Sequence, residues 1–278
     1  MKLESLSNSA IESADTDKAY EKAQRFLNEV SPRINPLDEE FVEHYGRKEV
    51  EKDVEYVAKM EEKFLQNNSE EASRMHKLAI IFEAIILDQV YSSEWLGESA
   101  DTTASSRYDD IKNGIDAIVE WEDGGEESEF LALAIDVTFA GDVSEKFSKI
   151  KKGISSDSSR VKYFSHNGTI GLESVPRAVI GADANTIKDL IELWLTGNKR
   201  ALGEHPVQIQ ILEEVIGQMK AFGEYAEKIG KKEVAVKYES MRDRLDRVYD
   251  KKIDIPKGNI DNDKVFKTIE KEIGIFNI

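Results

Sequence analysis

Cysteine is absent from the chain. Its absence excludes disulfide bonds, zinc–thiolate sites, iron–sulfur clusters and a cysteine nucleophile. Histidine is scarce, with four residues that are widely separated and show no i, i+4 pairing: His44, His76, His166 and His205. Two histidines one helical turn apart are a common way to hold a transition metal. A histidine-based metal site is therefore not expected.

Long hydrophobic runs are also missing. The most apolar stretch, Leu78 to Leu87, reaches only about half of a bilayer span and is interrupted by Glu83. The first residues, Met1 to Ser5, do not form the apolar segment of a secretory signal. The composition of 40% hydrophobic and 33% charged residues is typical of a folded globular protein. We expect no membrane helix and a cytoplasmic location.

Three common functional loops do not occur in the sequence. Gly-x-x-x-x-Gly-Lys-Ser/Thr and Gly-x-Gly-x-x-Gly, which bind nucleotide phosphates through backbone N–H groups at a helix start, are both absent. Gly-x-Ser-x-Gly, which presents a nucleophilic serine, is absent as well. The sequence thus gives no support to these types of nucleotide binding or to serine hydrolase chemistry.

Basic residues are fewer than acidic residues, and the excess of acidic residues varies along the chain. The chain has 55 acidic and 38 basic residues, a formal charge of −17. Residues 71–150 carry 18 acids and 6 bases, whereas residues 151–200 carry 5 acids and 8 bases. A basic strip follows the acidic region: Lys146, Lys149, Lys151, Lys152, Arg160 and Lys162. This arrangement suits a metal site beside a phosphate-binding surface, and it also suits ordinary solvated helix faces.

Hydrophobic periodicity predicts an α/β protein with three parts: an N-terminal helical extension (1–68), an α/β core (69–200) and a C-terminal helical hairpin with a tail (201–278). Expected helices cover residues 19–30, 49–65, 70–96, 143–154, 187–195, 206–229 and 232–251. Expected strands of a four-stranded mixed sheet cover residues 114–121, 130–139, 160–165 and 175–181. Gly97 to Arg107 is predicted to be a polar loop, and self-association through the C-terminal helices is a further expectation.

Three acids lie inside apolar segments: Glu83 in the longest apolar helix, and Asp116 and Asp136 in the first two strands. An ionised carboxylate in such surroundings is costly unless a cation or hydrogen-bond donors compensate it. These acids are candidates for metal binding or catalysis. Simpler interpretations are that Asp136 accepts backbone hydrogen bonds, that Asp116 opens its strand, and that Glu83 pairs with a core residue such as Arg177. Further acids that can join the site are Asp110 and Glu120, with Asp109 as a solvated neighbour.

The order of these elements resembles the αβββαβ core of the PD-(D/E)XK nuclease superfamily. Gly114-Ile115-Asp116 is similar to its Gly-x-Asp motif, Ile135-Asp136-Val137-Thr138 to its acid-x-Lys strand, and Glu83 to its helical acid. The resemblance covers roughly residues 70 to 195. It implies a nuclease-like fold and a metal-dependent hydrolase that cleaves phosphodiester bonds of DNA or RNA. The implied ligands of Mg²⁺ or Mn²⁺ are Glu83, Asp116, Asp136 and the carbonyl of Val137.

The sequence departs from this pattern at the lysine, because Thr138 stands where acid-x-Lys places it. That lysine orients the attacking water and stabilises negative charge, which threonine cannot do. Lys146 or Lys149, on the following helix, is the expected substitute, ahead of Lys112. The expected catalytic set is therefore Glu83, Asp116, Asp136, Lys146 and Lys149. The alternative is a catalytically inactive nuclease-fold protein that binds a protein partner as a scaffold.

Overall fold

The computed structural model describes residues 2–66, 70–122, 130–138, 143–156, 158–258 and 262–277. Within them the chain is a mixed α/β protein. The elements in order are α1 (Lys2–Glu29), α2 (Glu39–Tyr45), α3 (Arg47–Gln66), α4 (Glu70–Ser93), β1 (Ala100–Ala104), β2 (Ala117–Glu122), β3 (Phe130–Thr138), α5 (Ser144–Ser155), β4 (Arg160–His166), β5 (Thr169–Glu173), β6 (Arg177–Gly181), α6 (Ala184–Thr196), α7 (Lys199–Gly203), α8 (Val207–Lys228), α9 (Lys232–Lys251) and α10 (Lys264–Ile273).

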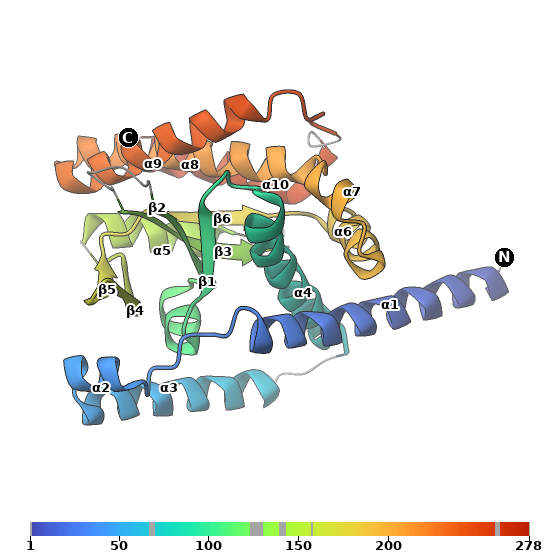
Figure 1. Cartoon of the computed structure of the whole chain (residues 1–278), viewed down its shortest axis with the longest axis horizontal. Coiled ribbons are helices and arrows are strands. Elements are labelled where there is room, and N and C mark those ends of the chain that lie inside the picture. Colours follow the sequence, from blue (N-terminus) through green and yellow to red (C-terminus); the bar gives the residue numbers. More distant parts are fainter. Residues whose placement is uncertain are drawn as a thin grey trace.

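A four-stranded mixed sheet with the strand order β1-β2-β3-β6 forms the centre of the fold. The first three strands are antiparallel, and β6 runs parallel to β3 with Asp136 opposite Val179. A parallel pair needs a crossover, which here contains α5 and the β4–β5 hairpin. In Figure 1 the hairpin α8–α9 lies above the sheet, and α1 to α3 lie below it. The predicted α/β class and a mixed sheet are confirmed, but the strand expected at Arg160 is not one of its four strands.

Two strand assignments were wrong. The segment expected to be a loop contains β1, whose ends Ala100 and Ala104 are buried and whose middle residues, 101–103, are polar and exposed or half-buried, as an edge strand allows. The strand expected at Arg160 pairs with β5 in a separate two-stranded sheet and does not join the central one. Both β4 and a central strand show the same alternation of side chains, so the pattern alone cannot distinguish them.

The largest apolar cluster of the described residues extends from α1 to Phe276. It contains residues from Ala19 in α1 to Phe276, and it surrounds the fully buried stretch Ile81 to Leu87 of α4, apart from Glu83. All three tryptophans are buried in this core: Trp95, Trp121 and Trp194. Among the described residues, no helix combines the length and the apolar composition that are required to cross a bilayer.

The predicted C-terminal helical hairpin is confirmed as α8 and α9, and α8 seals the outer edge of β6. Gln218 accepts a hydrogen bond from the N–H of Val179 (2.8 Å) and donates one to its carbonyl (2.7 Å). Glu214 accepts from the N–H of Gly181 (2.9 Å), and Gln210 donates to the carbonyl of Gly181 (2.9 Å). Glu214 and Gln218 are four residues apart on α8, a rise of about 6 Å, and Val179 and Gly181 are two residues apart on β6, a rise of about 6.6 Å. The helix spacing therefore matches the strand spacing. Side chains of α8 thus take the place of a fifth strand.

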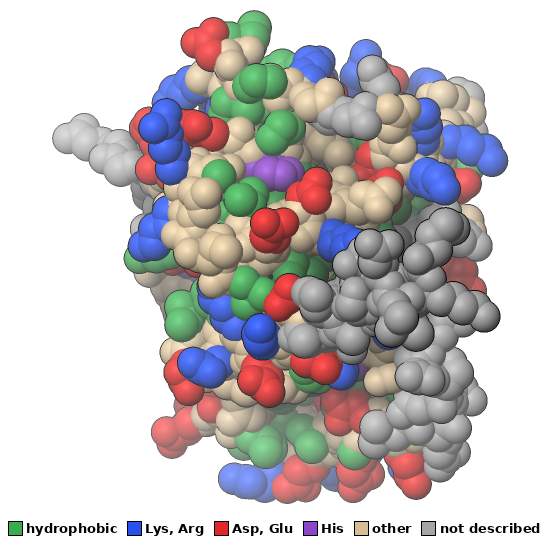
Figure 2. Space-filling view, turned by 90° about the vertical axis from the view of Figure 1, so that its right-hand side faces the viewer, with side chains coloured by type: hydrophobic (Ala, Val, Ile, Leu, Met, Phe, Trp, Pro, Cys, Tyr) green, Lys and Arg blue, Asp and Glu red, His purple; other side chains and the backbone are tan. Residues whose placement is uncertain are grey.

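The surface carries both signs of charge. On the described part of the face in Figure 2, Lys and Arg side chains lie interspersed with Asp and Glu side chains, without one broad basic patch. Interspersed charges of this kind give weak, strongly screened attraction to a polyanion. Any nucleic-acid contact on this face would therefore be local.

Candidate functional site

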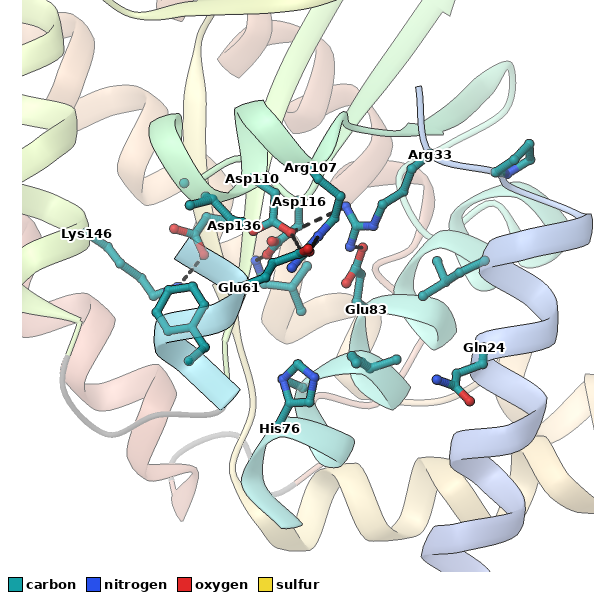
Figure 3. Close-up of a pocket in the computed structure, with 18 of the residues that line it drawn as sticks. Gln24, Arg33, Glu61, His76, Glu83, Arg107, Asp110, Asp116, Asp136 and Lys146 are labelled. Carbon is teal, nitrogen blue, oxygen red and sulfur yellow. Dashed lines mark hydrogen bonds and ion pairs between the residues drawn. The ribbon is translucent and has the colours of Figure 1, made fainter. Parts of the chain in front are cut away.

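A cavity of about 970 Å³ lies between α1, α3, α4, β3 and α5. Its lining contains every residue that the sequence analysis assigned to the site: Glu83, Asp116, Asp136, Val137, Lys146 and Lys149. In Figure 3 the side chains of Asp116, Asp136 and Glu83 are grouped at this cavity, and Lys146 reaches toward Asp136. Residues that are up to 66 positions apart in the chain thus line one pocket, while their chemical roles stay predictions.

Asp136 occupies the pocket face of β3 and is bound by a lysine from the next helix. Its side chain is 9% exposed, and its Oδ1 accepts a hydrogen bond from the Nζ of Lys146, which α5 carries. Lys149 lines the same pocket one helical turn further along α5 and is exposed. Residues three apart on a helix share a face, which explains why both point to the cavity. Lys146 therefore makes the contact that Thr138 cannot make.

Asp116 is held by the backbone of β3. The expected strand from Gly114 begins only at Ala117, because Gly114 ends a π-helical turn in the left-handed conformation (φ 66°). Asp116 donates its N–H to the carbonyl of Ile135 (2.8 Å), and its Oδ2 accepts the N–H of Val137 (2.7 Å). The carboxylate is thus fixed beside Asp136 before β2 starts.

The partner of Glu83 is Arg33, and the expected pairing with Arg177 is wrong. Arg33 donates from Nη2 to Oε1 of Glu83 (2.7 Å), and its Nη1 lies 3.6 Å from Oδ2 of Asp110. Arg177 instead donates to the carbonyls of Asn113 and Gly114. A lone arginine in the connection after α1 has no periodic signal, so the sequence did not point to Arg33.

The neighbouring acids Asp109 and Asp110 have different environments. Asp110 lines the cavity, where Arg107 binds its carboxylate and also donates to Glu61 of α3 (2.9 Å). Asp109 was expected to be solvated, but it is fully buried and accepts the N–H groups of Lys162 (2.8 Å) and Tyr163 (3.0 Å). Buried acceptors of this type hold structure together. Asp110 therefore joins the site, and Asp109 anchors β4.

Two other candidates lie outside the cavity lining. Glu120 was a possible addition to the acidic group, but it accepts a hydrogen bond from Thr103 (3.0 Å) and lines a different cavity. Lys112 was the less favoured substitute for the missing lysine. Its Nζ lies 5.2 Å from the ring centre of Tyr56 on α3. Neither residue contributes to the described lining of the main pocket.

Three carboxyl groups of the pocket have raised pKa values. Burial raises the pKa of Asp116 well above its usual value, and the charges of Asp110, Asp136 and Glu83 add to this effect. Burial also raises the pKa of Asp136, against the opposing influence of Lys146 and Arg177. For Glu83, burial outweighs Arg33 and raises the pKa to about 7. Each shift means that burial disfavours the charged form of the carboxyl group more than the neighbouring cations favour it.

The donor atoms of the pocket fit a hard divalent cation. Its described lining has six acidic side chains and four Lys or Arg side chains, which leaves two negative charges, with Arg177 adding one positive charge behind the lining. Carboxylate and carbonyl oxygens are the ligands that Mg²⁺ and Mn²⁺ prefer. Among the described residues, no three acidic or histidine side chains are gathered to hold an ion as they stand. Glu83 and Asp136 are bound to Arg33 and Lys146 instead.

The predicted basic strip does not form one surface. Lys162 is buried, where it binds Glu49 (2.5 Å) and Asp53 (2.7 Å) and lies over three tyrosine rings. Lys151 donates to the carbonyl of Ile275 near the C-terminal end. Alternation along β4 turns Lys162 inward, and five positions along a helix place Lys151 on a different face from Lys146. Nucleic-acid contact through Lys162 is therefore excluded in this fold.

Comparisons with protein-family models, with curated proteins and with solved structures found no match for this chain. The function must therefore be inferred from the contacts of the site. Its distinguishing features are buried carboxylates with raised pKa values, a lysine from the adjacent helix and a lining of hard oxygen donors. Groups of this kind are enriched at functional sites.

Proposed function

We propose that the chain is a divalent-metal-dependent nuclease that hydrolyses phosphodiester bonds of DNA or RNA. The observation that carries the proposal is the contact between Lys146 and Asp136 inside the pocket that also contains Glu83 and Asp116. The PD-(D/E)XK resemblance requires a cation beside the second strand acid, and Thr138 does not supply one. Lys146 supplies it from α5.

The order of the elements supports the same proposal. After α4 come β1, β2 and β3, then α5, and then β6 parallel to β3, with the β4–β5 hairpin inserted before β6. This order is compatible with the αβββαβ order that the resemblance implies, if the β4–β5 hairpin is taken as an insertion. Glu83 comes from the helix, Asp116 from the residue before the second strand, and Asp136 from the third strand. These positions on α4, before β2 and on β3 support the roles proposed for the three acids.

In the proposed mechanism, Glu83, Asp116, Asp136 and the carbonyl of Val137 would hold Mg²⁺ or Mn²⁺. The ion, when bound, lowers the pKa of an attacking water and polarises the phosphate. Lys146 moves from Asp136 toward the phosphate and stabilises the negative charge that develops there. Lys149, exposed at the same pocket, attracts the substrate phosphate. Arg33 moves from Glu83 to Asp110, which it already approaches.

A second candidate is a nuclease-fold protein that binds a partner without cutting. The observation that favours it is the state of the carboxylates, since Glu83, Asp110 and Asp136 each have a bound lysine or arginine. Ion pairs within the protein satisfy these acids without a metal ion. The two candidates differ in one respect: the nuclease must exchange these pairs for a divalent cation.

The test is a cleavage assay with single- and double-stranded DNA and RNA in Mn²⁺ and in Mg²⁺. We expect cleavage that Asp136→Asn and Asp116→Asn each reduce by about 10²- to 10³-fold, the size of effect seen when one preorganised catalytic group is lost. The matched control is Asp243→Asn, an exposed acid of α9, which should cleave like the unaltered chain. Cleavage unchanged in Asp136→Asn contradicts the nuclease. Absence of both cleavage and Mn²⁺ binding favours the second candidate.

A further inference from the structure

Arg177 joins three parts of the fold directly behind the proposed site. The residue lies on β6 and is 7% exposed. Its Nη2 donates hydrogen bonds to the carbonyls of Asn113 and Gly114, each with an N···O distance of 2.7 Å. Its backbone N–H donates to the hydroxyl of Tyr238 on α9 (3.2 Å). Two hydrogen bonds from one charged group to adjacent carbonyls fix the turn from which Asp116 emerges.

The guanidinium group of Arg177 also lies close to the carboxylate of Asp136. A Cβ added at Gly114 would lie 3.4 Å from Oδ2 of Asp136 and 3.6 Å from Nη2 of Arg177, so the two charged groups approach each other beside this glycine. Arg177 interacts electrostatically with both Asp136 and Asp116. One arginine thus serves two acids: it holds the backbone that leads to Asp116, and it supplies positive charge to both.

Two cations therefore act on Asp136 with different freedom to move: Lys146 contacts its carboxylate, and Arg177 acts on it through space. The Lys146 side chain is 29% exposed, stands at the pocket and has a single described contact, with Asp136. Arg177 is buried and is held by two carbonyls. A lysine stem is flexible, whereas the planar guanidinium loses little freedom when it already makes fixed hydrogen bonds. Lys146 can leave Asp136, and Arg177 cannot.

We propose that Arg177 is a positioning residue that permanently orients Asp116 and Asp136 for a divalent cation, while Lys146 is the exchangeable counter-ion. This inference rests on the proposed metal-dependent function. Groups behind metal ligands that fix their orientation contribute about 10- to 100-fold to metal affinity. Arg177 acts in this way on Asp116 through the backbone of Asn113 and Gly114.

A role through charge alone and a role in positioning predict opposite changes in Mn²⁺ affinity when Arg177 is removed. If only charge mattered, removal of either Lys146 or Arg177 would strengthen the binding of a divalent cation, because each repels it. If Arg177 positions the ligands, its removal must weaken binding, while removal of Lys146 still strengthens it. The affinity for Mn²⁺ therefore distinguishes the two roles without any cleavage assay.

The experiment measures Mn²⁺ affinity by titration calorimetry for the full chain and four variants, with folding checked by circular dichroism. Lys146→Met should bind Mn²⁺ more tightly, Arg177→Gln about 10- to 100-fold more weakly, and Arg177→Lys about 10-fold more weakly, since lysine keeps the charge without bridging two carbonyls. Arg200→Gln, an 86% exposed arginine, should bind like the unaltered chain.

Equal or tighter Mn²⁺ binding by folded Arg177→Gln overturns the inference. If that variant does not fold, Arg177→Lys decides, and unchanged affinity in it overturns the inference as well. Cleavage by the unaltered chain is measured in parallel. Mn²⁺ binding with the expected changes but without cleavage supports Arg177 and contradicts the nuclease. Cleavage with unchanged Mn²⁺ affinity in the Arg177 variants supports the nuclease and contradicts the positioning role of Arg177. If the unaltered chain does not bind Mn²⁺, both the proposed function and the role of Arg177 are overturned.

Discussion

Nη2 of Arg33 lies 2.7 Å from Oε1 of Glu83, and this contact attaches the connection after α1 to the middle of α4. The Glu83 side chain is 8% exposed, and the Arg33 side chain is 20% exposed. A buried carboxylate with a single cationic partner stays sensitive to proton uptake, because burial disfavours its charged form. The pair makes Glu83 the clearest source of pH-dependent stability in the chain.

Stability should fall as the pH rises through the titration of Glu83. Its pKa is raised from 4.5 to about 7, so between these values the folded chain holds a proton that the unfolded chain has released. The stabilisation is therefore present at low pH and is lost as pH rises through about 7, by up to about 3 kcal/mol. Urea unfolding at pH 5 to 8 measures it. Glu83→Gln should have a flatter profile, unlike the exposed control Glu204→Gln, and equal profiles would refute this assignment.

Lys162 should be one of the most important charged residues for stability. Its side chain is 5% exposed and binds Asp53 and Glu49. Lys162→Met leaves the partly buried Asp53 without its cation, and breaking such a pair costs about 3 kcal/mol of unfolding free energy. Thermal or urea unfolding checks the loss. Lys152→Met, at an exposed position of α5, should change stability by less than about 0.5 kcal/mol. Similar losses in both variants would contradict the structure.

Gly114→Ala should affect stability and the site together. Gly114 has φ of 66°, and alanine in this region costs about 1 kcal/mol. Its added Cβ would also contact Asp136 and Arg177. Gly197 at the end of α6 has φ of 68°, and a Cβ there meets no described atom within 4 Å. Gly197→Ala should thus lose similar stability and keep its Mn²⁺ affinity, whereas Gly114→Ala should lose part of that affinity. Equal Mn²⁺ affinity in the two variants would remove the link between Gly114 and the site.

Gln218→Ala should destabilise the chain more than an ordinary polar-to-alanine change. It leaves the N–H and the carbonyl of Val179 without the amide group that satisfies both. Each buried polar backbone group left unsatisfied costs about 1 to 3 kcal/mol, so we expect a loss of about 2 to 4 kcal/mol in chemical unfolding. Lys220→Ala, on the exposed face of the same helix, should lose less than about 0.5 kcal/mol. A loss below 1 kcal/mol for Gln218→Ala would contradict the proposed role of α8.

The sequence was sufficient for elements with strong periodicity and insufficient for those with weak patterns. The apolar run around Glu83 predicted α4, and the apolar run around Asp136 predicted β3, since burial on all sides leaves a clear pattern. β1 was missed because its centre, Asp101 to Thr103, is polar at an open edge. α10 was missed because it is a short helix of ten residues after a polar segment.

The same contrast applies to the site. Glu83, Asp116 and Asp136 could be predicted because an acid within an apolar segment is visible in the sequence itself. Their cations could be predicted only in part: Lys146 follows from its place on the next helix, whereas Arg33 and Arg177 come from distant segments that only the folded chain brings near. The apolar neighbours of an acid in the sequence indicate that the acid is buried. The cation that pairs with it is set by the tertiary structure.

The seal that α8 forms along β6 limits how copies of this chain can associate. Three outward N–H groups of β6, at Arg177, Val179 and Gly181, already have acceptors from α8 and α9. A foreign strand that approached this border would find no free donor there, and it would have to displace buried side chains first. Fibre-like growth by strand addition is therefore blocked at β6, and contacts between molecules on that side are restricted to side-chain surfaces.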